Sequence, residues 1–278
     1  LQISITDCNL NTCDIGLTTF SCFQPFVRGT AIAYFSVAGI YDQNCETPVY
    51  DKNDIVGGPV VPGTFQPLMN TPRRNSATVL QAGIVTLNSN GCVIQNNKIK
   101  NTYTCVAAEA DDPPVIKSNW IRADVKNGIH SYGPLRVDSN TFEPAYIAPY
   151  TITVDDTTDV ITASSAHGYA DGEEVFFWTS GTLPTNISIY TRYFVINSTS
   201  TTFKISTSSG GGAVDIASAG SGTHSVGICR RHVLYDIPNE GGLGYLGVIR
   251  GNNFQFNGGG GFYNFVEINT LGPSVDGS

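Results

Sequence analysis

The sequence predicts an all-β protein, namely a right-handed parallel β-helix into which an antiparallel β-sandwich or barrel module is inserted. Three observations favour this fold. Only 14% of the 278 residues are charged, and Gly, Ser, Thr and Asn are abundant, which suits strands and turns better than helices. A short phrase recurs at a nearly constant interval. The sequence also changes in character near residues 150–227, where short strand candidates alternate with turns.

The recurring phrase is an apolar residue, any two residues, Asn, any one residue and a second apolar residue. Its copies are Ile94–Ile99, Ile116–Ile121, Val137–Phe142 and Ile249–Phe254, with a degenerate copy at Ile5–Leu10. The second apolar positions of the first three copies are 22 and 21 residues apart, a spacing typical of solenoid repeats. Leucine-rich repeats share this period but need several Leu per repeat, which this sequence lacks. The phrase therefore favours the β-helix.

The Asn of each phrase is predicted to stand at a bend and to turn its amide inward. Stacked coils then place one amide above another, so that each side chain hydrogen-bonds the next and its buried polar groups are satisfied. Asn also tolerates the left-handed backbone of a tight bend. The predicted structural ladder consists of Asn97, Asn119, Asn140 and Asn252.

The domain organisation follows from this repeat. Residues 1–147 are predicted to form the first part of the β-helix, residues 148–227 the inserted module, and residues 228–278 the last part of the β-helix. Residues 46–76 are rich in Pro, Gly and Asn and are predicted to be a long loop. In the module, Val214–Ile216 is the sixth of seven strand candidates. Because the chain starts at Leu1, we expect a processed protein or a piece of a longer one.

Sequence stretches spread through the module carry a resemblance to a known family. They are Val160–Val175, Gly181–Pro184, Thr191–Asn197, Thr202–Ser206 and Gly220–Val226. In this order they resemble a module that recurs in tail proteins of tailed bacteriophages, and the β-helix portion is similar, more loosely, to phage tailspikes and pectate-lyase-like solenoids. The resemblance implies a tail fibre or tailspike component of the virion, assembled in the bacterial cytoplasm. It also implies a homotrimer that contacts other tail proteins and host surface polysaccharide, and it supplies no catalytic motif.

The outward positions around the ladder are candidates for glycan binding. Two residues before each Asn lie Gln95, Lys117, Asp138 and Arg250, and one residue after each lie Lys98, Trp120, Thr141 and Asn253. An exposed Trp120 beside Lys117, Asp138 and Arg250 would suit a sugar ring, because the indole packs on its C–H groups and charged groups bond its hydroxyls. The alternative is a solvated face with Trp120 buried under a loop or a neighbouring subunit.

A catalytic function is the second hypothesis. Glycoside hydrolysis needs two carboxyl groups about 5–9.5 Å apart, and Asp124, Asp138 and Glu143 lie on neighbouring coils. The two functions carried forward are a structural and adhesive tail component and a tailspike depolymerase, either a glycoside hydrolase or a polysaccharide lyase. An acidic cluster along a groove would favour the depolymerase.

Composition excludes several other classes. The net charge of -8 and the pI of about 4.8 argue against binding nucleic acid through a basic surface. No run of about 20 apolar residues is present, so no membrane span is expected. The seven cysteines and four histidines match no zinc spacing, and we expect mostly buried free thiols, no metal and no cofactor. The alternative for the cysteines is a disulfide among the four nearest the N-terminus, Cys8, Cys13, Cys22 and Cys45.

Overall fold

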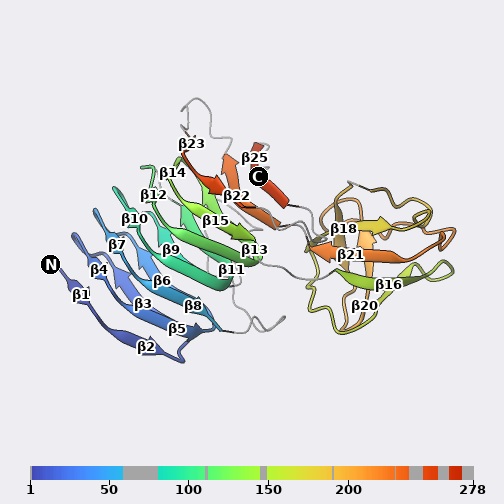
Figure 1. Cartoon of the computed structure of the whole chain (residues 1–278), viewed down its shortest axis with the longest axis horizontal. Coiled ribbons are helices and arrows are strands. Elements are labelled where there is room, and N and C mark those ends of the chain that lie inside the picture. The colour runs from blue at the N-terminus through green and yellow to red at the C-terminus, as the bar shows by residue number, and fades with distance from the viewer. Residues whose placement is uncertain are drawn as a thin grey trace, which may run out of the picture.

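The computed structural model describes residues 2–58, 81–109, 112–144, 149–189, 191–228, 230–237, 247–255 and 263–270. These residues form a parallel β-helix and, beside it, a closed antiparallel barrel, as Figure 1 shows. All 25 strands given bounds below fall into these two parts. The predicted fold class, an all-β solenoid with an inserted β-module, is therefore confirmed.

The first face of the solenoid is a seven-stranded parallel sheet with one strand from each coil. In spatial order its strands are β1 (Ser4–Thr6), β4 (Phe26–Arg28), β7 (Val49–Asp51), β10 (Val93–Gln95), β12 (Val115–Lys117), β14 (Leu135–Asp138) and β23 (Gly247–Arg250). Their central residues point inward and stack in register. This column consists of Ile5, Val27, Tyr50, Ile94, Ile116, Val137 and Ile249.

The second and third faces belong to one sheet, because strands β11 (Lys98–Glu109) and β13 (Trp120–Tyr132) continue around the corner between them. The second face adds β2 (Asn9–Asn11), β5 (Ala31–Phe35), β8 (Asp54–Gly57), β15 (Thr141–Pro144) and β24 (Asn253–Phe254). The third face adds β3 (Ile15–Phe20), β6 (Ala38–Gln43), β9 (Ala82–Leu87), β22 (Arg230–Ile237) and β25 (Tyr263–Thr270).

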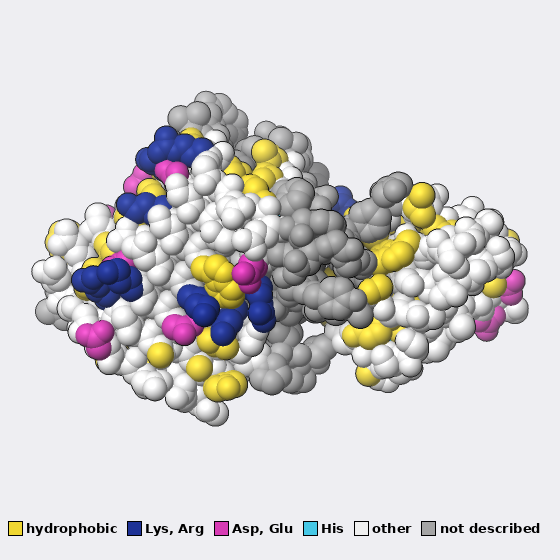
Figure 2. All heavy atoms as spheres, in the orientation of Figure 1, with side chains coloured by type: hydrophobic (Ala, Val, Ile, Leu, Met, Phe, Trp, Pro, Cys, Tyr) yellow, Lys and Arg dark blue, Asp and Glu magenta, His cyan; other side chains and the backbone are white. Residues whose placement is uncertain are grey.

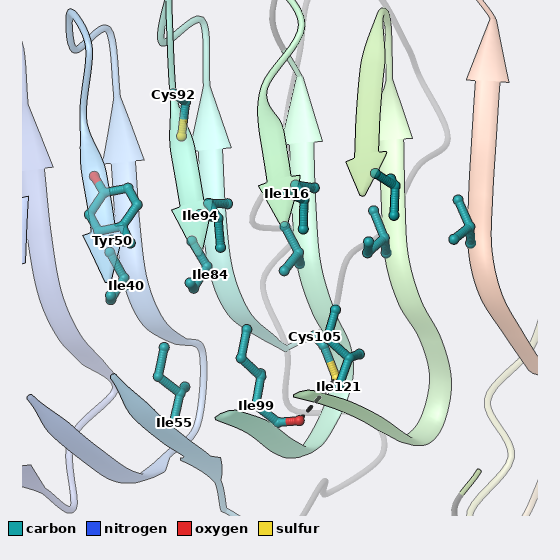
Figure 3. Packing of buried hydrophobic residues seen from close by; sticks show 14 of the residues in the cluster. Ile40, Tyr50, Ile55, Ile84, Cys92, Ile94, Ile99, Cys105, Ile116 and Ile121 are labelled. Atoms are coloured by element: carbon teal, nitrogen blue, oxygen red, sulfur yellow. Dashed lines mark hydrogen bonds between the residues drawn. The ribbon is translucent and has the colours of Figure 1, made fainter. Parts of the chain in front are cut away.

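The core of the solenoid is built mostly from β-branched side chains that repeat from coil to coil. Figure 3 shows Ile94 and, in the next coil, Ile116. Ile84 lies below Ile94 in this view, and Ile99 and Ile121 line the neighbouring wall. All five are fully buried. Each such side chain contributes roughly 1.5–3 kcal/mol on burial, so every coil adds a similar increment of stability to its neighbours.

Asparagine side chains stack at the corner between the first and second faces. Asn97 Nδ2 donates to Asn119 Oδ1 at 3.0 Å, and Asn119 Nδ2 donates to Asn140 Oδ1 at 2.9 Å. Asn140 Nδ2 donates to Asn252 Oδ1 at 3.0 Å across a separation of 112 residues in sequence. Asn53 begins this column, because its Nδ2 donates to Asn97 Oδ1 at 2.9 Å.

The left-handed backbone at this corner belongs to the residue before each ladder Asn, and not to the Asn as expected. Asn96 (φ 55°), Ser118 (φ 54°) and Ser139 (φ 55°) hold it. The reason is that the ladder Asn must also give its backbone N–H to the next amide: the Asn119 N–H donates to Asn140 Oδ1 at 2.9 Å. The preceding residue makes the bend and leaves the Asn free to form both bonds.

Part of the segment predicted to be a loop is solenoid. Strands β7 and β8 lie within residues 46–76, so the prediction was wrong for that part, while residues 59–80 lie outside the described residues. The phrase is present there as Tyr50–Ile55 with Asn53 in the Asn position. Tyr50 and Ile55 are fully buried, which shows that the inward pattern mattered more than the local Pro and Gly content.

The inserted module is a closed barrel of six antiparallel strands around its own core. In barrel order the strands are β16 (Tyr150–Asp155), β17 (Val160–Ala163), β20 (Thr202–Ser206), β19 (Tyr193–Ile196), β18 (Glu174–Thr179) and β21 (His224–Ile228). The predicted strand Val214–Ile216 is not formed. Val214 N–H makes a single backbone bond to the Ile205 carbonyl at 2.8 Å, and Ile216 fills the barrel core while its own N–H donates to Asp159 Oδ1 at 2.8 Å, so this apolar segment packs without forming a strand.

Polar contacts join the barrel to the solenoid. The Tyr103 hydroxyl, in β11, donates to Glu173 Oε1 at 3.0 Å. The next residue, Glu174, is paired with Arg231 of β22 and also lies 3.3 Å from Arg192 of the barrel. Arg231 is only 2% exposed. A buried arginine that meets a carboxylate from the other part fixes where the start of β18 lies against the solenoid.

Candidate functional site

The outer surface of the first face carries three of the residues predicted to bind glycan. Lys117, Asp138 and Arg250 follow one another in register on β12, β14 and β23. They point outward because their neighbours Ile116, Val137 and Ile249 point into the core.

Asp138 is held by arginine. Arg250 donates to Asp138 Oδ2 from Nε at 3.0 Å and from Nη2 at 2.8 Å, and Arg136 Nη2 lies 3.5 Å from the same oxygen. The Arg250 bonds, helped by hydrogen bonds from Ser139 and Arg136, lower the pKa of Asp138 below its usual value. A carboxyl group that stays ionised at neutral pH is a poor general acid.

Trp120 stands on a different face from these three residues. It is the first residue of β13 on the second face, beyond the corner formed by Ser118 and Asn119. The side chains of Lys117 and Trp120 therefore point outward from different sheets. The residues predicted to bind glycan are split between two faces, because a phrase that spans a corner places its ends on different surfaces.

The three catalytic candidates do not meet on one described surface. Asp138 faces outward from the first sheet, whereas Glu143 faces outward from the second, with the bend at Ser139 and Asn140 between them. The side chain of Asp124 lies outside the described residues. Glu143 is in register with Arg122 on the neighbouring coil, so its closest partner by register is basic rather than a second carboxylate.

The side chains that do surround Trp120 come from the second face. Lys98 is in register with Trp120, and its Nζ lies 5.1 Å from the centre of the indole ring. Lys100 and Arg122 are two residues further along the same strands and point to the same side, because Ile99 and Ile121 between them are buried. Figure 2 shows, on the solenoid, a hydrophobic patch with basic side chains around it and acidic ones at its edge.

Lys100 and Arg122 were missed from the sequence, although a signal for them exists. The position three residues after the ladder Asn points outward on the same side as the position one residue after it. It holds Val56, Lys100, Arg122 and Glu143 on successive coils. Reading the second strand of each phrase as carefully as the first would have placed both basic residues beside Trp120.

The third face offers a less open surface. Ala82, Val85, Leu87, Ala107 and Tyr132 of its central strands form a buried apolar cluster that is separate from the solenoid core. His130 is also buried and its ring lies tilted by 42° against that of Tyr132, with ring centres 4.3 Å apart. The second face, with Trp120 half-buried and Lys98 exposed, is therefore the better candidate for contact with a large polar ligand.

No group of three or more His, Cys, Asp or Glu side chains in the described ranges is placed to hold a metal ion. Those same ranges hold no helix that is long and apolar enough to cross a membrane.

Comparison with known proteins identifies the solenoid. Residues 2–165, more than half of the chain, match the family described as the right handed beta helix region. The chain belongs to this right-handed β-helix family. The match ends just after β17 of the barrel, and strands β22 to β25 extend the solenoid beyond it. No curated protein matches the chain.

Proposed function

We propose that this chain is a structural and adhesive component of a phage tail fibre or tailspike, and that its solenoid contacts a surface glycan. Right-handed β-helix regions are common in tailspikes and in enzymes that degrade polysaccharides, and the module sequence resembles one that recurs in phage tail proteins. On this proposal the protein works in the virion tail as a homotrimer beside other tail proteins.

The observation that carries the proposal is the setting of Trp120. Its indole is half-buried on the outer surface of a parallel sheet, and the ammonium of Lys98 lies over the ring, 5.1 Å from its centre. An indole can pack against the C–H groups of a sugar, while polar side chains around it bond the hydroxyls. A parallel sheet repeats its outward positions every 4.7–4.9 Å or so, which presents an extended surface to an extended chain.

The geometry favours adhesion over cleavage. Asp138 is engaged by Arg250, and Glu143 projects from the other side of the corner. These two carboxyl groups are therefore not a matched acid and nucleophile on one surface. Depolymerase activity remains the competing hypothesis, and the experiment below separates the two.

The test uses the purified full chain and a panel of bacterial capsule and lipopolysaccharide preparations. Binding is measured by biolayer interferometry, and cleavage by released reducing ends and by absorbance of unsaturated uronate. We expect binding without product, and we expect Trp120→Ala to weaken binding about tenfold, since a stacked ring contributes on the order of 1 kcal/mol beyond its buried area. Trp178→Phe, in the barrel, is the matched control and should bind as the wild type does.

Each other outcome has a defined meaning. Product release that Asp138→Asn or Glu143→Gln abolishes would establish the depolymerase and overturn the adhesive proposal. Binding that Trp120→Ala leaves unchanged would show that the second face is not the contact. Failure to bind any glycan in the panel would overturn the proposal and leave a purely structural role.

A further inference from the structure

Three basic side chains gather around Trp120 although the chain as a whole is acidic. The net charge of the protein is -8, yet Lys98, Lys100 and Arg122 project from two neighbouring coils of the second face. We call these three residues and Trp120 the basic patch. In the part of the chain that the structure describes, neither Lys98 nor Lys100 forms an ion pair, so neither ammonium is neutralised by a carboxylate, and that of Lys98 lies over the Trp120 ring.

Two carboxylates border the basic patch along the solenoid axis. Asp54 precedes Lys98 in register on β8, and Glu143 follows Arg122 in register on β15. Arg122 Nη2 donates to Asn101 Oδ1 at 3.1 Å, which holds the guanidinium close to the sheet. The surface therefore presents an aromatic ring and cations at its centre and hydrogen-bond acceptors at both ends.

We propose that the basic patch binds an acidic polysaccharide, one whose sugar rings carry carboxylate or sulfate groups. This inference rests on the proposed function and names the class of glycan. An acidic sugar offers the three features that the patch can engage together: an apolar ring face for Trp120, an anionic group for Lys98, Lys100 and Arg122, and hydroxyl groups for Asp54, Glu143 and Asn101.

The arrangement favours an acidic glycan over a neutral glycan. A neutral glycan would leave the two lysines without an ionic partner. A sugar that stacks on Trp120 brings its anionic group to the Lys98 ammonium, which lies only 5.1 Å from the ring centre.

The experiment measures binding of the full chain to polygalacturonate, dextran sulfate, neutral dextran and polyglutamate by isothermal titration. We expect the first two to bind and the last two to bind at least tenfold more weakly, because dextran lacks the charge and polyglutamate lacks the sugar ring. Raising the salt from 0.1 M to 1 M should weaken binding strongly, since the Debye length falls from about 10 Å to about 3 Å.

Two variants locate the site. Lys98→Ala/Lys100→Ala should weaken binding of the acidic polysaccharides at least tenfold, because both charged hydrogen-bond donors to the anionic groups are removed. Lys204→Ala, on β20 of the barrel, is the matched control and should bind as the wild type does. Circular dichroism checks that both variants are folded, which we expect because all three lysines project outward.

The outcomes separate this inference from the proposed function. Polygalacturonate binding alone assigns carboxylate as the recognised group, and dextran sulfate binding alone assigns sulfate. Equal affinity of the wild type and the double variant would overturn the site. Polyglutamate bound as tightly as polygalacturonate would overturn the saccharide class. Binding of neutral glycans from the capsule panel that depends on Trp120 but not on the lysines would overturn this inference and leave the adhesive function standing.

Discussion

Removing one amide from the middle of the asparagine ladder should destabilise the solenoid far more than removing one at its end. Asn119 is 2% exposed and makes four side-chain hydrogen bonds. Its Oδ1 accepts from the backbone N–H and from Nδ2 of Asn97, at 2.9 and 3.0 Å. Its Nδ2 donates to Asn140 Oδ1 and to the Ile94 carbonyl, both at 2.9 Å.

The magnitude follows from the groups that Asn119→Ala leaves without partners. Asn140 Oδ1 keeps a bond, because the Asn119 backbone N–H still donates to it. Asn97 loses the acceptor for two N–H groups, and it is itself only 1% exposed. A buried donor without an acceptor costs about 1–3 kcal/mol, so the two together cost roughly 2–6 kcal/mol. That is a large share of the roughly 5–15 kcal/mol by which typical domains are stable.

Urea unfolding followed by tryptophan fluorescence measures this effect. The chain has two Trp residues, Trp120 in the solenoid and Trp178 in the barrel, so a Trp178→Phe background lets fluorescence report the solenoid alone. The control is Asn252→Ala at the other end of the ladder, where the bonds to Asn140 are only partly buried and water can replace them. A loss below about 1 kcal/mol for Asn119→Ala, or equal losses for the two variants, would refute the account of the ladder as buried and mutually satisfied.

Two further predictions concern packing and pH. A Cβ added at Gly83 would lie 2.6 Å from the Cys105 carbonyl oxygen, so Gly83→Ala should lower the free energy of unfolding in urea by roughly 1–3 kcal/mol. The control is Gly212→Ala, which should be neutral because a Cβ there would meet nothing within 4 Å. Equal effects of the two variants would contradict the close approach of the coils. Burial lowers the pKa of His232 to about 4. The neutral imidazole therefore contributes its full stability above the ordinary pKa near 6.5. As pH falls from 6.5 towards 4, the free energy of unfolding should decrease by roughly 2–4 kcal/mol. The His232 ring contacts the rings of both Phe142 and Phe254. His232→Phe should flatten that part of the pH dependence, and an unchanged slope would show that His232 does not cause it.

The repeat made most of the solenoid predictable from sequence, because its physical basis is local. An apolar residue, a bend and a ladder Asn must recur wherever a coil turns this corner. The pattern therefore located the strands around Asn97, Asn119, Asn140 and Asn252 without any long-range information. It failed at Asn53, where an aromatic residue, Tyr50, starts the phrase and a stretch rich in Pro and Gly follows it.

The candidate site was less predictable, because it depends on which face each side chain occupies. Lys117 and Trp120 are three residues apart in sequence but belong to different sheets. Lys98 and Trp120 are 22 residues apart but lie side by side. The register between neighbouring coils decides which side chains surround Trp120. A sequence shows this register only when the corresponding strands of successive coils are aligned with one another.

The long separation between Asn140 and Asn252 has a consequence for how the chain folds. A direct pairing of β15 with β24 must bring together residues 112 apart, and contacts of such long range slow folding because the entropy of loop closure comes before the contact. The folded barrel reduces the length of loop that must be closed, since Tyr150 at its start is paired with Val226 near its end. We therefore expect the barrel to close first and β22 and the last coil, β23 to β25, to add afterwards, so that the slowest step in completing the solenoid is set by a domain that contributes no strand to it.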